Sequence, residues 1–202
     1  MLFLKPISNL KNTIVFWFIY IVILSPMNAS TQIIQSYDVV IYGGTSAGVS
    51  AAIQCSRMGK KVILIEPTNR MGGLTTGGLG KTDIGNKQAI GGLAREFYQN
   101  IKRYYLKPEN WIWEKREDYT GVGYNTFNED AMWAFEPSVA LKVFLEMVKN
   151  ESNIHIVYNQ RLNRKTGVKK EKQVIKSIQM ESGQIYQGKM FMDCTYEGDL
   201  MA

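Results

Sequence analysis

The sequence is poor in the residues that most often hold metal ions or carry nucleophilic catalysis. Its 202 residues include one histidine, His155, and two cysteines, Cys55 and Cys194. The cysteines form no C-x-x-C pair, which argues against a dithiol redox centre and against a zinc ribbon. With one histidine, on an expected strand, we expect neither a metal site nor a His-based catalytic triad. Both cysteines are expected to be small buried apolar residues, with a disulfide as the alternative.

Aromatic residues are missing from the most basic part of the chain. Five cationic side chains cluster around Gly167: Arg164, Lys165, Lys169, Lys170 and Lys172. A nucleic-acid-binding surface usually interleaves aromatic residues with basic ones. We therefore expect no nucleic-acid partner, and we interpret this segment as a solvated hairpin turn.

An apolar run long enough to cross a membrane is also missing. The apolar run at residues 13–24 is shorter than the roughly 20 residues that a membrane span needs. Lys5 and Lys11 precede it, and Pro26 and Ala29 follow it. This order is typical of a secretory signal peptide, which we place at residues 1–30. The protein is then exported, to a periplasm or outside the cell; the alternative is that the segment is retained as a membrane anchor.

The segment YDVVIYGGTSAGVSAAIQCSRMGKKVILIEP, residues 37–67, has the clearest pattern. Its β-branched residues 39–41 predict a parallel strand buried on both faces, ended by a tight turn at Gly43 and Gly44. Residues 47–58 are compatible with a helix, and the small residues of its first turns let it lie close to a sheet. Residues 62–65 predict a second buried strand, which ends at Glu66. This order indicates the first unit of a dinucleotide-binding fold, with a purely structural βαβ unit as the alternative.

The glycine-rich turn is the expected phosphate site. A helix N-terminus offers backbone N–H groups and the positive end of a dipole to a pyrophosphate. Glu66, about 20 residues after the turn, is placed to accept hydrogen bonds from a ribose. The usual motif is G-x-G-x-x-G, but here Thr45 replaces the middle glycine. Thr45 is compatible with a phosphate-binding turn if its side chain points away from the phosphates, or if its hydroxyl bonds a phosphate oxygen.

The next segment, PTNRMGGLTTGGLGKTDIGNK at residues 67–87, is too rich in glycine for a helix or a core strand. We expect it to lie beyond the pyrophosphate, where Arg70 could pair with phosphate. The glycine pairs at residues 72–73 and 77–78 would let backbone pack against a flat ring system. A flexible surface loop is the alternative.

Downstream, the pattern predicts helices at residues 91–105 and 137–150 and a buried strand at residues 154–158. The aromatic stretch between the helices is either a substrate wall or a cap whose rings pack on each other. Residues 161–188 predict antiparallel hairpins, with turns at residues 165–167 and 182–183. A core strand is expected at residues 190–192, and Asp193, Cys194 and Thr195 follow it directly. A helix is expected to begin at residues 197–199.

A β-meander that returns to the sheet through a strand ending in Asp is a flavoprotein arrangement. Four stretches, DVVIYGGTSAGVSAAI, VILIEPTNRMGGLTTGGLG, FEPSVA and DCTYEGDLMA, resemble the FAD-dependent oxidoreductase family. This family has the glutathione-reductase-type Rossmann fold, and some members carry a xanthan lyase label. The resemblance covers nearly all of residues 37–202. It implies an α/β fold: a Rossmann-type parallel sheet with a β-meander crossover and a helical, aromatic insertion at about residues 81–136.

The resemblance also implies FAD as the cofactor and a set of binding residues. The pyrophosphate site comprises Gly43, Gly44, Thr45, Ser46, Ala47 and Gly48, and the adenosine end comprises Glu66, Pro67 and the backbone of Leu162. The path to the flavin is lined by Arg70, Gly72, Gly73 and Leu74, and the second family signature contributes Cys194 and Thr195. That signature is usually DAT-x-x-GD, and Cys194 stands here in place of alanine.

Related enzymes continue past the EGDL signature with a substrate domain, so the resemblance implies that residues 37–202 are an incomplete FAD-binding domain. The expected function is the FAD-binding portion of an exported oxidoreductase that acts on a small molecule, for which a carbohydrate-related compound is one candidate. We assign no catalytic residue. The alternatives are a non-catalytic remnant or nucleotide-binding subunit of a split enzyme, and a polysaccharide lyase. Membrane contact is expected only if the N-terminal segment is retained.

Overall fold

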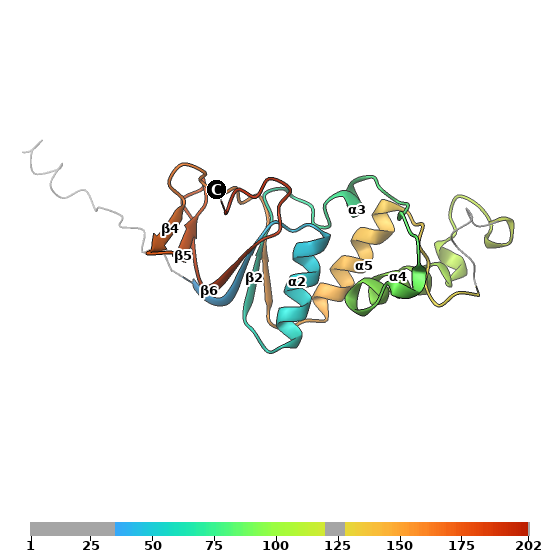
Figure 1. Cartoon of the computed structure of the whole chain (residues 1–202). Helices are drawn as coiled ribbons and strands as arrows, with labels where there is room; N and C mark the ends of the chain where they lie inside the picture. The colour runs from blue at the N-terminus through green and yellow to red at the C-terminus, as the bar shows by residue number, and fades with distance from the viewer. Residues whose placement is uncertain (1–34, 120–127, 202) are drawn as a thin grey trace, which may run out of the picture. The chain divides into compact units, whose positions relative to one another are not determined.

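A six-stranded sheet organises the part of the chain that the computed structural model describes, residues 35–119 and 128–201 (Figure 1). The order of the strands is β3-β2-β1-β6-β5-β4. Their bounds are Gln35–Tyr42 for β1, Val62–Ile65 for β2, Ile154–Val157 for β3, Val168–Glu171 for β4, Val174–Gln179 for β5 and Ile185–Asp193 for β6. The expected α/β class with a meander is confirmed. The expected signal peptide lies outside the described residues, as do Tyr124 and Phe127 of the aromatic stretch between the two expected helices.

The parallel half of the sheet brings the ends of its four strands, β3, β2, β1 and β6, to one edge. β1 runs parallel to β2 and to β6, and Tyr42 lies opposite both Ile65 and Asp193. The segments that follow these residues therefore start side by side, although they are far apart in the sequence. In open α/β sheets, ligands bind outside the carboxyl ends of the strands.

Both faces of the central strands are buried, as the β-branched runs predict. Val39 and Ile41 pack into a core with the helices, whereas Val40 and Tyr42 pack into a second core on the opposite face. The second core is completed by side chains from the meander and its flanking loops, including Leu162, Met180 and Leu200. Alternate residues of a strand point to opposite faces, so two apolar faces require an uninterrupted apolar strand.

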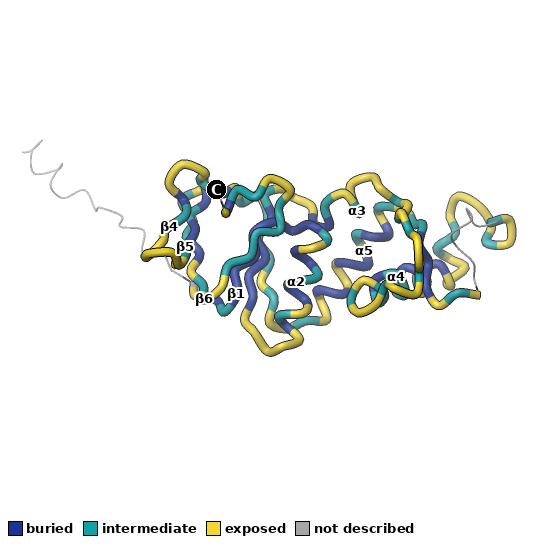
Figure 2. The backbone as a smooth tube through the Cα atoms, in the orientation of Figure 1, coloured by how far each residue is buried: buried dark blue, intermediate teal, exposed yellow. Residues whose placement is uncertain are grey.

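The helices lie on one side of the sheet. The bounds are Ser46–Arg57 for α2, Leu74–Gly77 for α3, Gly92–Tyr105 for α4 and Pro137–Lys149 for α5, with short 3-10 helices at Lys87–Ala89, Pro108–Asn110 and Arg116–Asp118. α2 contacts β1 and β2, and α4 and α5 contact α2 and each other (Figure 1). Figure 2 shows the buried backbone following the central strands and the inner sides of α2 and α5.

The meander differs from its expected form in one turn. The turn at residues 182–183 joins β5 to β6 as expected, but β4 and β5 are joined through Lys172, which has a positive φ of 57°. Residues 165–167 form a turn before β4 instead. The expected strand at residues 190–192 is the second half of β6, which pairs antiparallel with β5 and parallel with β1. One long strand thus joins the meander to the parallel sheet.

Four further expectations are corrected by the structure. β3 is an edge strand, so its side chains are half-buried or exposed, and Met190 on β6 is 62% exposed. Residues 197–199 form no helix in the described chain but lie in a turn. Cys55 and Cys194 are half-buried free thiols and are not joined to each other.

Among the described residues, no helix is long and apolar enough to cross a membrane.

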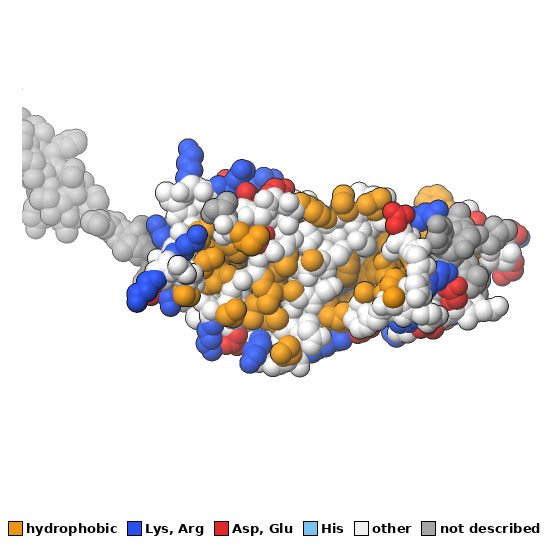
Figure 3. Space-filling model, viewed as in Figure 1, with side chains coloured by type: hydrophobic (Ala, Val, Ile, Leu, Met, Phe, Trp, Pro, Cys, Tyr) orange, Lys and Arg blue, Asp and Glu red, His pale blue; other side chains and the backbone are white. Residues whose placement is uncertain are grey.

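The basic segment forms the β4–β5 hairpin at the edge of the sheet. Lys169, Lys170 and Lys172 are exposed, as expected of a solvated hairpin. Figure 3 shows Lys and Arg side chains at this end of the molecule, while hydrophobic side chains on the same view lie over the sheet and toward α5.

Candidate functional site

A cavity of about 410 Å³ lies where β1, β2 and β6 end. Eight of the residues expected to bind the cofactor line it: Gly43, Thr45, Glu66, Pro67, Arg70, Gly73, Leu162 and Thr195. The other seven do not line it but are neighbours of these residues in the sequence: Gly44, Ser46, Ala47, Gly48, Gly72, Leu74 and Cys194. The sequence pattern and the strand register therefore lead to the same edge of the sheet.

The glycines of the turn allow three segments to pack closely. Gly43 has a positive φ of 101°, and a Cβ there would lie 2.7 Å from the backbone of Cys194 and Thr195. A Cβ on Gly48 would lie 1.9 Å from the Gly43 carbonyl oxygen. Side chains at either position would separate the turn from α2 or from the end of β6.

The Thr45 hydroxyl is bonded within the protein, which argues against the second of its two expected alternatives, a bond to a phosphate oxygen. The hydroxyl donates to the Cys194 carbonyl at 2.7 Å and accepts from the Gly48 N–H at 3.3 Å. Because a hydroxyl has one proton to donate, this bond leaves none for a phosphate oxygen. Thr45 is the N-cap of α2, so it orders the helix start and ties it to β6. Ala47, in the first turn of α2, is exposed.

Glu66 is held rigidly at the end of β2. Its side chain is only 7% exposed, and its Oε2 accepts a hydrogen bond of 2.7 Å from the Gly44 N–H. Its Oε1 accepts from both the backbone N–H and the hydroxyl of Thr68, each at 2.7 Å. A carboxylate has about four acceptor positions, so Glu66 can still accept a hydrogen bond from a hydroxyl in the cavity.

The glycine-rich segment after β2 packs along the phosphate turn rather than standing away as a flexible loop. The Gly72 N–H donates to the Gly44 carbonyl at 2.6 Å, and Ser46 Oγ donates to the Gly72 carbonyl at 3.0 Å. Arg70 lines the cavity, but its guanidinium also donates to the carbonyl of Thr76. Its position is therefore fixed by α3 before any phosphate binds.

Leu162 lines the opposite wall of the cavity and is 1% exposed. Its N–H donates to Tyr42 Oη at 3.0 Å, so a backbone contact with adenine would have to come from its carbonyl. Burial raises the pKa of the Tyr42 phenol above its ordinary value, which keeps this acceptor neutral.

The second signature is organised by Asp193 at the end of β6. One carboxylate oxygen accepts from the N–H and hydroxyl of Thr195, at 2.9 and 2.7 Å, and the other accepts from the Leu200 N–H at 2.7 Å. The turn that carries Thr195 is thereby fixed at the end of β6. Burial and the neighbouring Asp193 raise the pKa of the Cys194 thiol, which keeps it protonated and unsuited to a nucleophile.

The expected set of binding residues left out several residues that line the cavity. They are Tyr42, Thr68, Arg161, Arg164, Glu181, Tyr196, Glu197 and Asp199. Tyr196 accepts a hydrogen bond of 3.0 Å from the Leu74 N–H, and Arg164 pairs with Asp199 at 3.3 Å. Tyr196, Glu197 and Asp199 belong to the second signature, in its segment YEGD, so that motif could have identified them as lining residues.

The arrangement fits a dinucleotide better than it fits a structural βαβ unit. A glycine-rich turn, a helix N-terminus and an acid after the second strand meet at one cavity, as dinucleotide binding requires. Arg70 and Gly73, from the glycine-rich segment that leads to α3, also line this cavity.

Two solved structures are similar to parts of this chain. L-proline dehydrogenase from P. horikoshii matches with a TM-score of 0.51 and 15% identity, over 84% of this chain and 55% of that one. PqsL, a probable FAD-dependent monooxygenase from Pseudomonas aeruginosa, matches with a TM-score of 0.47 and 12% identity, over 78% of this chain and 42% of that one. The chain thus spans about half the length of these proteins.

The family model described as FAD dependent oxidoreductase matches residues 38–202. The match begins in β1 and includes the glycine-rich turn, Glu66, residues 81–136 and the second signature. Because it covers most of the chain, the protein belongs to the FAD-dependent oxidoreductase family, with FAD as its cofactor.

Proposed function

We propose that this chain is the FAD-binding portion of an exported oxidoreductase that acts on a small molecule. Glu66 and Leu162 would hold the adenosine end of FAD, the N-terminus of α2 would hold the pyrophosphate, and Arg70 and Gly73 would lie on the side of the flavin. FAD supplies the transfer of a hydride or an electron pair. The residues of this chain bind the cofactor, orient it and exclude water from its adenosine end.

The observation that carries this proposal is the position of Glu66. Its carboxylate accepts the N–H of Gly44 from the phosphate turn while it lines the cavity. A single acid thus connects the segment that would hold the pyrophosphate with the place where a ribose hydroxyl would donate. The meander and the second signature after β6 favour a flavin dinucleotide over a nicotinamide one.

We expect the refolded or purified chain to take up FAD in a saturable manner, at one FAD per chain. Titration of FAD, followed by flavin fluorescence and by the visible spectrum of protein separated from free flavin, measures the uptake. NADH under the same conditions should bind more weakly than FAD, because the meander and the second signature favour a flavin dinucleotide. Uptake of NADH under conditions in which FAD does not bind would contradict the proposal.

Export rests on the pattern of residues 1–30, namely a basic start, a short apolar run and small residues after it. Cell fractionation followed by N-terminal sequencing should find the protein outside the cytoplasm, beginning near Ser30 or Thr31. A chain of full length in the membrane fraction would instead support a retained anchor.

A further inference from the structure

A second cavity, of about 340 Å³, lies in the aromatic insertion beside the C-terminal end of α4. None of the residues that line it also lines the cofactor cavity. α3 lies between the two, because Gly73 precedes that helix and borders the cofactor cavity, whereas Gly80 follows it and borders the second one.

The floor of the second cavity is apolar and aromatic. Tyr105 and Met132 are buried, and the rings of Tyr105 and Trp111 lie 5.5 Å apart between centroids. Trp111 also contacts Tyr119, at 5.1 Å, and its Nε1 donates to the Tyr105 carbonyl at 2.8 Å. The rings pack on each other, as the cap interpretation of this stretch expects, and together they leave a hollow.

The wall of this cavity is fixed by backbone pairing. The Phe135 N–H donates to the Gly80 carbonyl at 2.7 Å, and the Thr82 N–H donates to the Trp133 carbonyl at 3.1 Å. A Cβ on Gly80 would lie 2.2 Å from the Phe135 carbonyl oxygen. The two segments can therefore approach this closely only with glycine at position 80.

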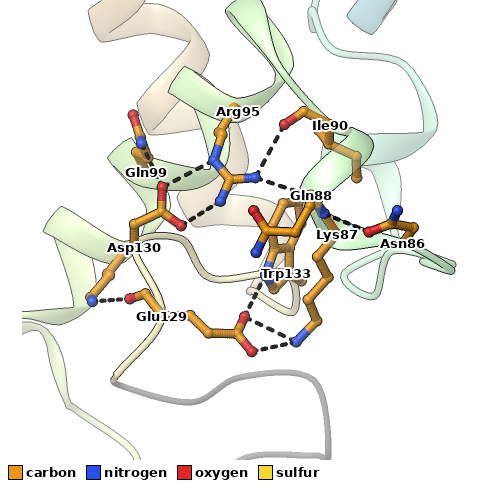
Figure 4. A network of polar contacts seen from close by, with 10 residues as sticks. Asn86, Lys87, Gln88, Ile90, Arg95, Gln99, Glu129, Asp130 and Trp133 are labelled. Carbon is orange, nitrogen blue, oxygen red and sulfur yellow. Dashed lines mark hydrogen bonds and ion pairs between the residues drawn. The ribbon is translucent and has the colours of Figure 1, made fainter.

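A polar network behind the wall holds Trp133 in place (Figure 4). The carboxylate of Glu129 accepts from the Trp133 indole at 3.0 Å and pairs with Lys87 at 2.8 Å. Next to it, Asp130 pairs with Arg95 of α4 at 2.6 Å. These contacts fix the segment that supplies Met132 to the floor, so the cavity is formed before any ligand arrives.

Exposed apolar residues stand at the rim. Trp113 is 87% exposed and Ile112 is 76% exposed, and both line the cavity. Large exposed apolar side chains grouped beside a hollow commonly mark a binding site. An indole can cover one face of a flat ring at low cost in conformational entropy.

The polar groups of the cavity include acceptors for a hydrogen-bond donor. Tyr105 Oη donates to Glu136 Oε2 at 2.9 Å and accepts from the Glu136 N–H at 3.0 Å, so its single proton is used. Burial raises the pKa of Tyr105 and keeps that proton in place. The Glu136 carboxylate is exposed at the rim and has further acceptor positions.

We propose that this cavity binds a planar aromatic compound of one or two rings that carries a hydroxyl or amino donor. The rings would lie between the aromatic floor and Trp113, and the donor would bond Glu136. A cavity of about 340 Å³ is at the small end of the range for ligand pockets, which suits one or two fused rings. The proposal does not depend on flavin binding.

The test is equilibrium dialysis of the full chain against 2-naphthol, with and without FAD. We expect saturable binding of one 2-naphthol per chain in both conditions. Trp113→Ala should weaken that binding by about five- to tenfold, because it removes one aromatic face. Met58→Ala is the matched control, since Met58 is 63% exposed at the end of α2, away from the cavity, and should leave binding unchanged.

Two results would overturn the proposal: equal binding by the Trp113→Ala variant and the unchanged chain, or binding of methyl glucoside without binding of 2-naphthol. The second result would identify the cavity as a saccharide site. Ile112→Ser, at a residue that is likewise exposed, is a second variant if Trp113→Ala does not fold, and it should also weaken 2-naphthol binding. Circular dichroism of each variant reports on folding independently of either ligand.

Discussion

Replacing Gly48 by valine is expected to abolish FAD binding. Even the first side-chain carbon at this position would lie 1.9 Å from the Gly43 carbonyl oxygen, and valine adds two methyl groups to it. The start of α2 would then have to move away from the phosphate turn, and its N–H groups would no longer face the pyrophosphate. FAD titration of the purified variant, with circular dichroism to show that the sheet has formed, measures the effect.

Gly85→Val is the matched control for this change. A Cβ on Gly85 would meet no atom within 4 Å, and its backbone does not have the positive φ that favours glycine. FAD binding by this variant should equal that of the unchanged chain. If Gly48→Val were folded and still bound FAD with unchanged affinity, the glycine-rich turn would not be the phosphate site.

Replacing Glu66 by alanine is expected to weaken FAD binding by roughly ten- to a hundredfold, because hydrogen bonds to a charged group contribute about 1.5–3 kcal/mol. The variant should also be less stable by about 1–3 kcal/mol, since the Gly44 N–H would lose its partner inside the protein. FAD titration measures the first effect, and urea unfolding without FAD measures the second.

Two variants separate these contributions. Glu66→Gln keeps an acceptor oxygen for Gly44 or for Thr68 but not for both, so its losses should be smaller than those of alanine. Glu171→Ala removes an acid from the exposed β4–β5 hairpin, where its partner Lys176 is 3.7 Å away, and should change neither measurement. Equal losses of FAD binding from Glu66→Ala and Gly48→Val would show that the acid and the glycine-rich turn do not have separate roles.

The first half of the fold was predictable because its signals are local. The apolar runs of β1 and β2, the small residues of α2 and the acid at Glu66 each follow from neighbouring residues. The two alternatives for Thr45 could be written down from the sequence, but only the position of the Cys194 carbonyl argues against the second. That carbonyl lies almost 150 residues away along the chain.

The corrected features depend on neighbours that a local pattern does not contain. β3 has the composition of a buried strand but lies at the edge of the sheet, so His155 and its neighbours are only partly covered. The helix expected at residues 197–199 is replaced by a turn because Asp193 binds the N–H groups of Thr195 and Leu200. Arg161 and Glu181 reach the cofactor cavity from loops, and loop positions follow from tertiary packing.

The place of β6 between β1 and β5 also determines the order in which the molecule can assemble. Val40 of β1 pairs with Phe191 of β6, so the centre of the sheet closes a very long loop of chain. Such distant pairings have a high contact order and form slowly, whereas the β4–β5–β6 hairpins are local and form early. The phosphate turn is synthesised near the start of the sheet, but its partners Cys194 and Thr195 arrive with the last of the six strands. We therefore expect FAD to bind after the sheet has formed and to stabilise it, rather than to start its folding.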